Sequence, residues 1–358
     1  MSHQRSFSPT LVLALSLALG SATTSLAATA TTDPVGYNTV SLLANSDTYV
    51  SVPFNRPAAF VGQVSSVSGN TITVAGTPGW TSSQFVYAAG SQSNTYYAFI
   101  RSGTKEGNYY TVTGNGANTL TIDLAGDTLS GLAADDSISV VPYWTLGTLF
   151  PASDAGVSFT ATTGLAKKTE IRIPDVNGTG TNRVPVGRYY FQSATSSWRD
   201  YSGVDKSDEI LIPDSYFIVS NPASVATGTL TTTGNVVTKK FVIPIVSMAA
   251  TSQDNPVAIP RPVPVSLDDS GLISSGAFVI TTGLAIKDQV YVYDNSIAGK
   301  NKSEIARYFY KNGAWRKFGD EANNYGSAII FSPNTAVKIV KAKSANDSSV
   351  DWVNTPTY

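Results

Sequence analysis

Two tryptophan–arginine pairs are the residues of this sequence whose types are best suited to bind a ligand. Trp198 precedes Arg199, Trp315 precedes Arg316, and both pairs follow a run of aromatic residues. An indole ring can stack on a sugar, and a guanidinium offers five hydrogen-bond donors. Side chains alternate across a strand, so each arginine would point away from the tryptophan beside it. The pairs predict a glycan-binding surface as one hypothesis, and cross-strand packing of the rings in a core as the favoured alternative.

Three pairs of adjacent carboxylates could support hydrolysis: Asp135-Asp136, Asp208-Glu209 and Asp268-Asp269. Glycoside hydrolysis needs two carboxylates about 5–10 Å apart in a cleft, one of them with a raised pKa. Neighbouring residues of a strand point to opposite faces, and all three pairs lie among the small and polar residues that are typical of turns. We therefore expect exposed turns, and a carboxylate-based glycoside hydrolase is the least favoured function.

The segment Asp175–Thr179 places side-chain oxygens at alternate positions, as a calcium-binding loop does. A similar segment later in the chain keeps an aspartate, Asp294, but adds Lys300 and Lys302, which would repel a cation. A glycine-containing turn that is braced by the side chain of Asp175 is therefore the favoured interpretation. We predict no bound metal ion and no other cofactor.

Cysteine is absent from the chain, and His3 is its only histidine. No disulfide can form. His3 lies in the predicted signal peptide at 1–27, so in the mature chain neither a histidine-dependent nucleophile nor a zinc site of imidazole or thiolate ligands can be built. Catalysis would have to use carboxylates, lysine, tyrosine or an oxygen-bound cation. We predict that the protein is not an enzyme.

The elements that would position these residues occur twice. Residues 159–191 and 278–310 align at an offset of 119 with 12 identities in 33 positions, and the tryptophan–arginine pairs align at an offset of 117. Composition alone would give roughly two identities. The alignment predicts an internal duplication of a structural unit.

Short alternating segments predict strands throughout the chain. Residues 70–74, 119–123, 170–173 and 289–293 each place apolar side chains on one face. Asn312-Gly313 between two aromatic segments predicts a tight β-hairpin, because both residues tolerate a positive φ. The fold class we expect is all-β, with two related β-sandwich or barrel-like domains.

The similarity between the two halves is interrupted in the first half by about 80 additional residues. We predict a first β domain at 28–61 and 143–226, an inserted small β-barrel-like module at 62–142, and a second β domain at 227–358 that repeats the first. An insert of this length is long enough for one small barrel or open sheet.

Residues 1–27 have the pattern of a signal peptide, with Arg5, an apolar run at 11–19 and small residues before the cleavage site. We expect the mature chain to be exported to the periplasm, the outer cell surface or the extracellular space, without spanning a membrane. The chain carries 24 basic and 25 acidic side chains, and this balance argues against nucleic acid as a partner.

Several short sequence segments resemble those of an uncharacterised family of secreted proteins from Verrucomicrobium-type bacteria. These segments are Asp33–Tyr37, Val52–Pro57, Asp214–Val219, Pro264–Leu272 and Ala314–Arg316. The resemblance covers most of the mature chain and implies export. It implies no catalytic residues.

The favoured function is that of a non-catalytic structural or adhesive protein of the cell surface or extracellular matrix. Export, the repeat, and a β-rich composition without cysteine support it. Its partners would be other envelope or matrix proteins, or further copies of the chain. The first alternative is a glycan-binding module that uses the two aromatic–arginine hairpins and has polysaccharide as its partner.

Overall fold

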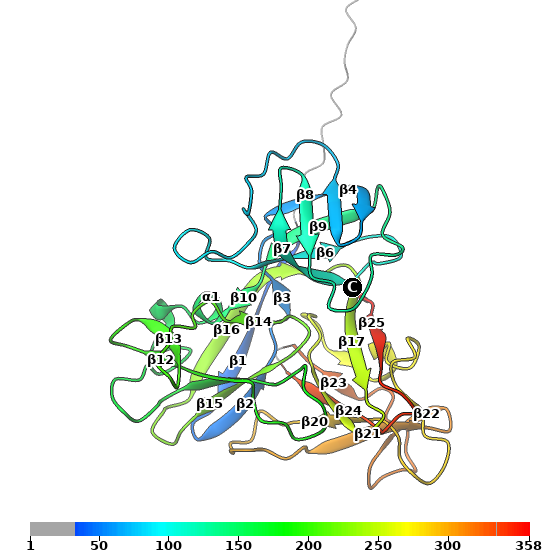
Figure 1. Ribbon diagram of the computed structural model, residues 1–358. Coiled ribbons are helices and arrows are strands. Elements are labelled where there is room, and N and C mark those ends of the chain that lie inside the picture. The colour runs from blue at the N-terminus through cyan, green and yellow to red at the C-terminus, as the bar shows by residue number, and fades with distance from the viewer. Residues whose placement is uncertain (1–32, 334) are drawn as a thin grey trace, which may run out of the picture. The chain divides into compact units, whose positions relative to one another are not determined.

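Strands make up almost all of the regular structure, which confirms the expected all-β fold class (Figure 1). The computed structural model describes residues 33–333 and 335–358, so the predicted signal peptide at 1–27 lies outside the described residues. The helical elements of this part are one turn of α-helix, α1 (Leu146–Leu149), and two short 3₁₀ helices, η1 (Ala152–Asp154) and η2 (Asp268–Ser270). None of the helices described has the length and apolar character needed to cross a membrane.

A closed barrel of six antiparallel strands occupies the middle of the first half. Its strands pair in the order β4-β5-β8-β7-β6-β9, and β9 closes the barrel by pairing with β4. The bounds are β4 (Phe60–Ser68), β5 (Thr71–Val74), β6 (Tyr96–Ile100), β7 (Tyr109–Asn115), β8 (Thr119–Ile122) and β9 (Ser137–Pro142). Alternate residues such as Ile72, Leu120 and Ile138 fill its interior together with Trp80. A barrel therefore lies where the inserted module is expected, and the boundaries 62–142 stay a prediction.

Two five-stranded antiparallel sheets have corresponding strand orders. The first sheet is ordered β2-β15-β11-β12-β13, and the second is ordered β18-β24-β20-β21-β22. The first comprises β2 (Ser46–Val50), β15 (Phe217–Asn221), β11 (Glu170–Ile173), β12 (Gly187–Gln192) and β13 (Ser197–Asp200). The second comprises β18 (Gln253–Val257), β24 (Val337–Lys341), β20 (Gln289–Val292), β21 (Ala306–Lys311) and β22 (Ala314–Lys317). The segments that align in the sequence thus hold the same places in the two sheets, and their origin by duplication stays a prediction.

Smaller sheets complete the architecture. They pair β1 (Val35–Leu42), β16 (Gly228–Val236) and β3 (Phe54–Asn55); β10 (Trp144–Thr145) and β14 (Ile210–Leu211); β17 (Phe241–Ser247) and β25 (Ser348–Asn354); and β19 (Val265–Ser266) and β23 (Ile329–Phe331). One apolar cluster joins barrel residues such as Tyr97 and Phe99 to Phe241, Trp315 and Trp352 of the second half. Residues Pro34–Tyr358 accordingly form one compact unit.

The predicted hairpin in the second half is present. The turn between β21 and β22 is formed by Asn312 and Gly313, with φ angles of 53° and 74°. Glycine has no Cβ and asparagine tolerates this left-handed region, so the two strands reverse without strain.

Two loops at matching positions of the sequence connect the two five-stranded sheets, because each loop binds the edge strand of the other sheet. The loop 175–183 follows β11 and contacts edge strand β18, while the loop 294–302 follows β20 and contacts edge strand β2. The backbone N–H of Asp254 donates to the carbonyl of Gly180 at 3.1 Å, and that of Asp47 donates to Gly299 at 2.8 Å. We call these two segments the reciprocal loops. Each covers part of an edge strand whose backbone groups would otherwise be open to another chain.

Each reciprocal loop is also held by a carboxylate on the strand that it covers. The Asp254 carboxylate accepts from the backbone N–H of Asn182 at 2.8 Å, and the Asp47 carboxylate accepts from Asn301 at 2.8 Å. Asn182 and Asn301 align in the sequence, so the same contact is made twice in opposite directions. Asp47 is only 3% exposed.

Candidate functional site

The outer face of the first sheet carries an unusual concentration of charged and phenolic side chains. Alternation along the strands sends Ile171, Tyr189 and Trp198 into the apolar core. It therefore sends Glu170, Arg188 and their neighbours to the opposite face. The outward set consists of Glu170, Arg172, Arg188, Tyr190 and Tyr201, and we call it the Glu170 cluster.

Glu170 is the hub of this cluster. Its carboxylate accepts hydrogen bonds from Arg188 at 2.9 Å, from Arg172 at 3.3 Å and from the Tyr201 hydroxyl. The Arg188 guanidinium also lies over the Tyr201 ring, 4.9 Å from its centroid. The Tyr190 ring packs edge-on against Tyr201 with centroids 5.9 Å apart. These contacts fix the orientation of the Tyr201 ring.

The electrostatics of the cluster favour binding over proton transfer. Burial by itself raises the pKa of Glu170, but the hydrogen bonds from Tyr201 and Arg188 outweigh it and leave the pKa below its ordinary value. Burial and the hydrogen bond to Glu170 raise the pKa of Tyr201 to about 12. Near neutral pH the carboxylate is ionised and the phenol is protonated. A general acid needs a pKa closer to the working pH.

The corresponding face of the second sheet lacks the carboxylate and the phenol groups of the Glu170 cluster. Gln289 stands at the position of Glu170, Phe309 at that of Tyr190 and Phe318 at that of Tyr201. Arg307, which matches Arg188, donates instead to Glu304 at 2.6 Å. Two faces built on the same strand order therefore differ mainly in their polar groups, and the first is the candidate site.

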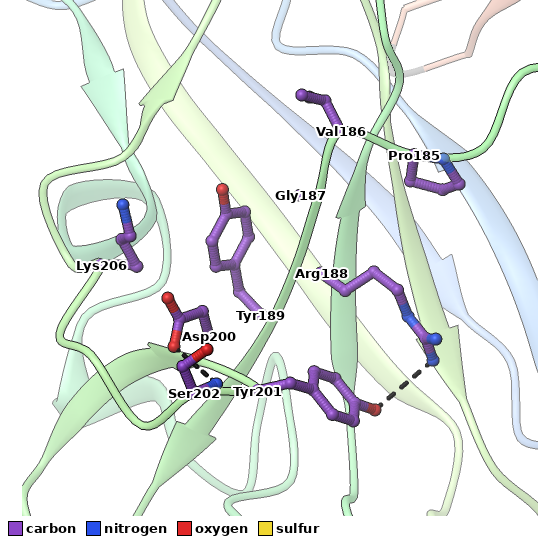
Figure 2. A pocket seen from close by; sticks show the side chains of 9 residues that line it. All are labelled: Pro185, Val186, Gly187, Arg188, Tyr189, Asp200, Tyr201, Ser202 and Lys206. Carbon is purple, nitrogen blue, oxygen red and sulfur yellow. Dashed lines mark hydrogen bonds between the residues drawn. The ribbon is translucent and has the colours of Figure 1, made fainter.

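An open pocket of about 480 Å³ adjoins the cluster (Figure 2). Residues before and within β12 form one wall, and the last residue of β13 and residues after it form the other. The lining residues are Pro185, Val186, Gly187, Arg188, Tyr189, Asp200, Tyr201, Ser202 and Lys206. Pockets of about 300–1,000 Å³ are the usual size for small-molecule sites.

Both predicted tryptophans lie in the core. Trp198 is fully buried, and its indole N–H donates to the carbonyl of Phe150 at 2.9 Å. Trp315 is 1% exposed and packs against Phe278, with ring centroids 5.0 Å apart. Neither ring offers a face to a ligand, because the apolar side of each sheet needs large side chains to fill it. The burial of both rings agrees with the favoured interpretation, packing in a core, and contradicts the glycan-binding hypothesis for these two rings.

The predicted arginines brace turns. Arg199 donates to the Thr195 hydroxyl at 2.9 Å and to the carbonyl of Gly203. Arg316 donates to the carbonyl of Ala322 at 3.0 Å. Each arginine thus stabilises the loop that follows its hairpin, and neither lines the pocket.

The other sequence-based candidates lie in turns. Asp268 and Asp269 are exposed in η2. Asp208 and Glu209 are partly buried in a turn before β14, and Asp135 and Asp136 lie in the turn before β9. The Asp175 carboxylate accepts from the backbone N–H groups of Asn177 and Gly178 at 3.1 and 2.8 Å, as in the braced turn expected there. Within 33–333 and 335–358, no group of three or more acidic, histidine or cysteine side chains is placed to hold a metal ion.

Comparisons of the chain with protein-family models, curated proteins and solved structures find no match. The resemblance to a secreted family stays a prediction.

Glu170, Arg188 and Tyr201 were missed as site residues by the sequence analysis. A signal for them was present, since strand alternation places Arg188 and Tyr201 opposite the core rings. Their convergence on Glu170 depends on the pairing of β11 with β12, which brings residues 170 and 190 together.

Proposed function

We propose that this protein is an exported, non-catalytic structural or adhesive protein that associates with further copies of itself at the cell surface or in an extracellular matrix. The observation that carries the proposal is a pair of matched loop tips. Leu165 and Leu284 align in the sequence and are 98% and 99% exposed. Each lies within an identical five-residue segment, Thr162–Ala166 and Thr281–Ala285.

Both tips are held rigidly by the same hydrogen bonds. The Thr162 hydroxyl accepts from the backbone N–H of Lys168 at 3.0 Å, and the Thr281 hydroxyl accepts from that of Lys287 at 3.1 Å. The backbone N–H of each threonine donates at 2.8 Å to the neighbouring central strand, at Phe191 or Tyr310. A loop closed in this way holds its leucine away from the protein.

The presence of two exposed leucine tips in one chain favours self-association over binding to a different partner. One leucine gains only about 1.5–3 kcal/mol when it is buried, so a single tip would bind weakly. A chain with two matched tips can contact two neighbours at once, and repeated weak contacts add up in an assembly. The expected signal peptide and the resemblance to a secreted family support an extracellular location.

Sedimentation velocity of the mature chain over a range of concentrations tests the proposal. We expect reversible association by the wild type, and a shift to monomer in the Leu165→Ser, Leu284→Ser double variant. The matched control is a Val35→Ser, Ile297→Ser double variant, which removes two other exposed apolar side chains that are 74% and 62% exposed. A wild type that stays monomeric and is absent from the envelope fraction of its cells would refute the proposal.

A further inference from the structure

The pocket beside Tyr201 has no role in contacts made by the leucine tips. It lies at the end of the β12–β13 hairpin, where the side chains of Arg188 and Tyr201 point to one side of the hairpin and those of Tyr189 and Asp200 point to the other (Figure 2). Its lining combines two phenol rings, two cationic side chains and an aspartate with the apolar Pro185 and Val186. This mixture of ring and polar surface is what a ligand with both C–H faces and hydroxyl groups requires.

Tyr201 is the exposed ring of this pocket. Its side chain is 52% exposed although its hydroxyl is bonded to Glu170 and Arg188 lies over it. The contacts that hold the ring therefore occupy only part of its surface. A ring that is already fixed loses little conformational freedom when it stacks on a ligand. Tyrosine also tolerates a wet surface because one end of the ring is polar.

Polar groups lie on both sides of the hairpin end. Oδ1 of Asp200 accepts from the backbone N–H groups of Ser202 and Val204 at 2.9 Å each, which orients the carboxylate at the pocket wall. Arg188 is bound to Glu170 through one nitrogen and is still 48% exposed, and Lys206 is 36% exposed. Sugar hydroxyls accept hydrogen bonds, so they match the guanidinium donors that Arg188 offers beside the ring.

The second sheet replaces most of this lining. At the matched positions it has Glu304 for Pro185, Lys317 for Asp200, Phe318 for Tyr201 and Gly319 for Ser202. Phe318 is 56% exposed, so its matched ring is as accessible as that of Tyr201. The chain therefore contains an internal control that keeps an exposed ring with an arginine beside it, Arg307 at 5.7 Å from the Phe318 centroid, and differs in the other polar groups.

We propose that the pocket binds a pyranose unit of a polysaccharide, with Tyr201 as the stacking ring and Arg188, which lies on the same side of the hairpin, as a hydrogen-bonding partner of its hydroxyl groups. The site differs from the tips at Leu165 and Leu284, so either proposal can fail without the other.

Retention of the mature protein on immobilised cellulose, starch, mannan, galactan and pectate tests the proposal. Washing with about 1 M NaCl, at which the Debye length is about 3 Å, removes protein that is held only by surface charge. We expect at least one polysaccharide to retain the wild type after this wash. The Tyr201→Ala variant should be retained about tenfold less, as expected from the loss of one aromatic contact.

Two further variants separate binding from folding. Tyr201→Phe keeps the ring and should retain binding, and Phe318→Ala removes the matched ring of the second sheet and should bind as the wild type does. Circular dichroism and urea midpoints confirm that each variant is folded. Failure of every polysaccharide to retain the wild type would overturn the proposal. Retention that is lost equally in Tyr201→Ala and Phe318→Ala would overturn it as well.

Discussion

The carboxyl of Asp214 is expected to contribute a stabilisation that is lost as the pH rises from about 4 to 6. Asp214 lies between β14 and β15. The residue is partly exposed as a whole, but its Oδ1 is inaccessible to solvent and has no hydrogen-bond partner among the described residues. Burial raises the pKa of Asp214 from its ordinary value of 3.8 to about 6, although a hydrogen bond from Tyr109 opposes part of that effect. Replacing Asp214 with asparagine removes the titration and keeps the size of the side chain.

The sign and size of the effect follow from the two pKa values. The folded protein holds this proton more tightly than the unfolded chain does. The stabilisation that comes from protonated Asp214 is therefore fully present below about pH 4 and is lost as the pH rises toward 6. The difference between 3.8 and about 6 corresponds to about 3 kcal/mol. At neutral pH the ionised carboxylate lowers the free energy of unfolding by about that amount relative to a neutral group.

Urea unfolding of the wild type and of Asp214→Asn at several pH values between 4 and 7.5 measures this effect. All other titrating groups are shared by the two proteins, so they cancel in the difference between the two unfolding free energies. We expect the free energy of unfolding of Asp214→Asn to rise by about 2–2.5 kcal/mol relative to that of the wild type between pH 4 and pH 7. A Tyr109→Phe variant should move the loss to higher pH, because the hydroxyl that lowers the pKa of Asp214 is gone. A difference that does not change with pH, or that changes in the opposite direction, would refute the reasoning.

Two further predictions concern the reciprocal loops and the core. Asp47→Ala removes the acceptor of the Asn301 N–H and of the Ser220 hydroxyl and takes a carboxylate from the partly exposed Lys300 and Arg172, so urea unfolding should show a loss of about 3 kcal/mol. Asp294→Ala, which disturbs only its own turn, should cost about 1 kcal/mol, and equal losses would argue against a stabilising role of the reciprocal loops. Trp198→Ala should lose about 3–5 kcal/mol because the ring is fully buried, whereas Arg199→Ala should lose about 1 kcal/mol. A stable, folded Trp198→Ala variant with an unchanged urea midpoint would contradict the core assignment.

Local patterns in the sequence were sufficient for the strands and the hairpin. Period-two alternation at 119–123 and 170–173 corresponds to β8 and β11, and Asn312-Gly313 forms the turn between β21 and β22. These features depend on neighbouring residues only, and the backbone preferences of a few residues decide them.

Such local patterns in the sequence predict only part of the candidate site. Alternation indicates that Trp198 and Arg199 face opposite ways, but it does not say which face is the core. The sheet places the tryptophan inward, and it brings Tyr201 to Glu170 across 31 positions of the sequence. A ligand site that joins side chains from separate strands depends on which strands pair.

The sequence by itself determined an all-β chain with two similar halves and a barrel-length segment between matching parts. Only the tertiary structure determined that a loop of each half binds the edge strand of the other half, at Asp47 and at Asp254. It also decided that Arg188 and Tyr201 of the first sheet meet at one carboxylate, Glu170. The physical reason is that strand formation is governed by local alternation, whereas strand pairing and loop docking join residues far apart in the chain and depend on how the whole core is packed.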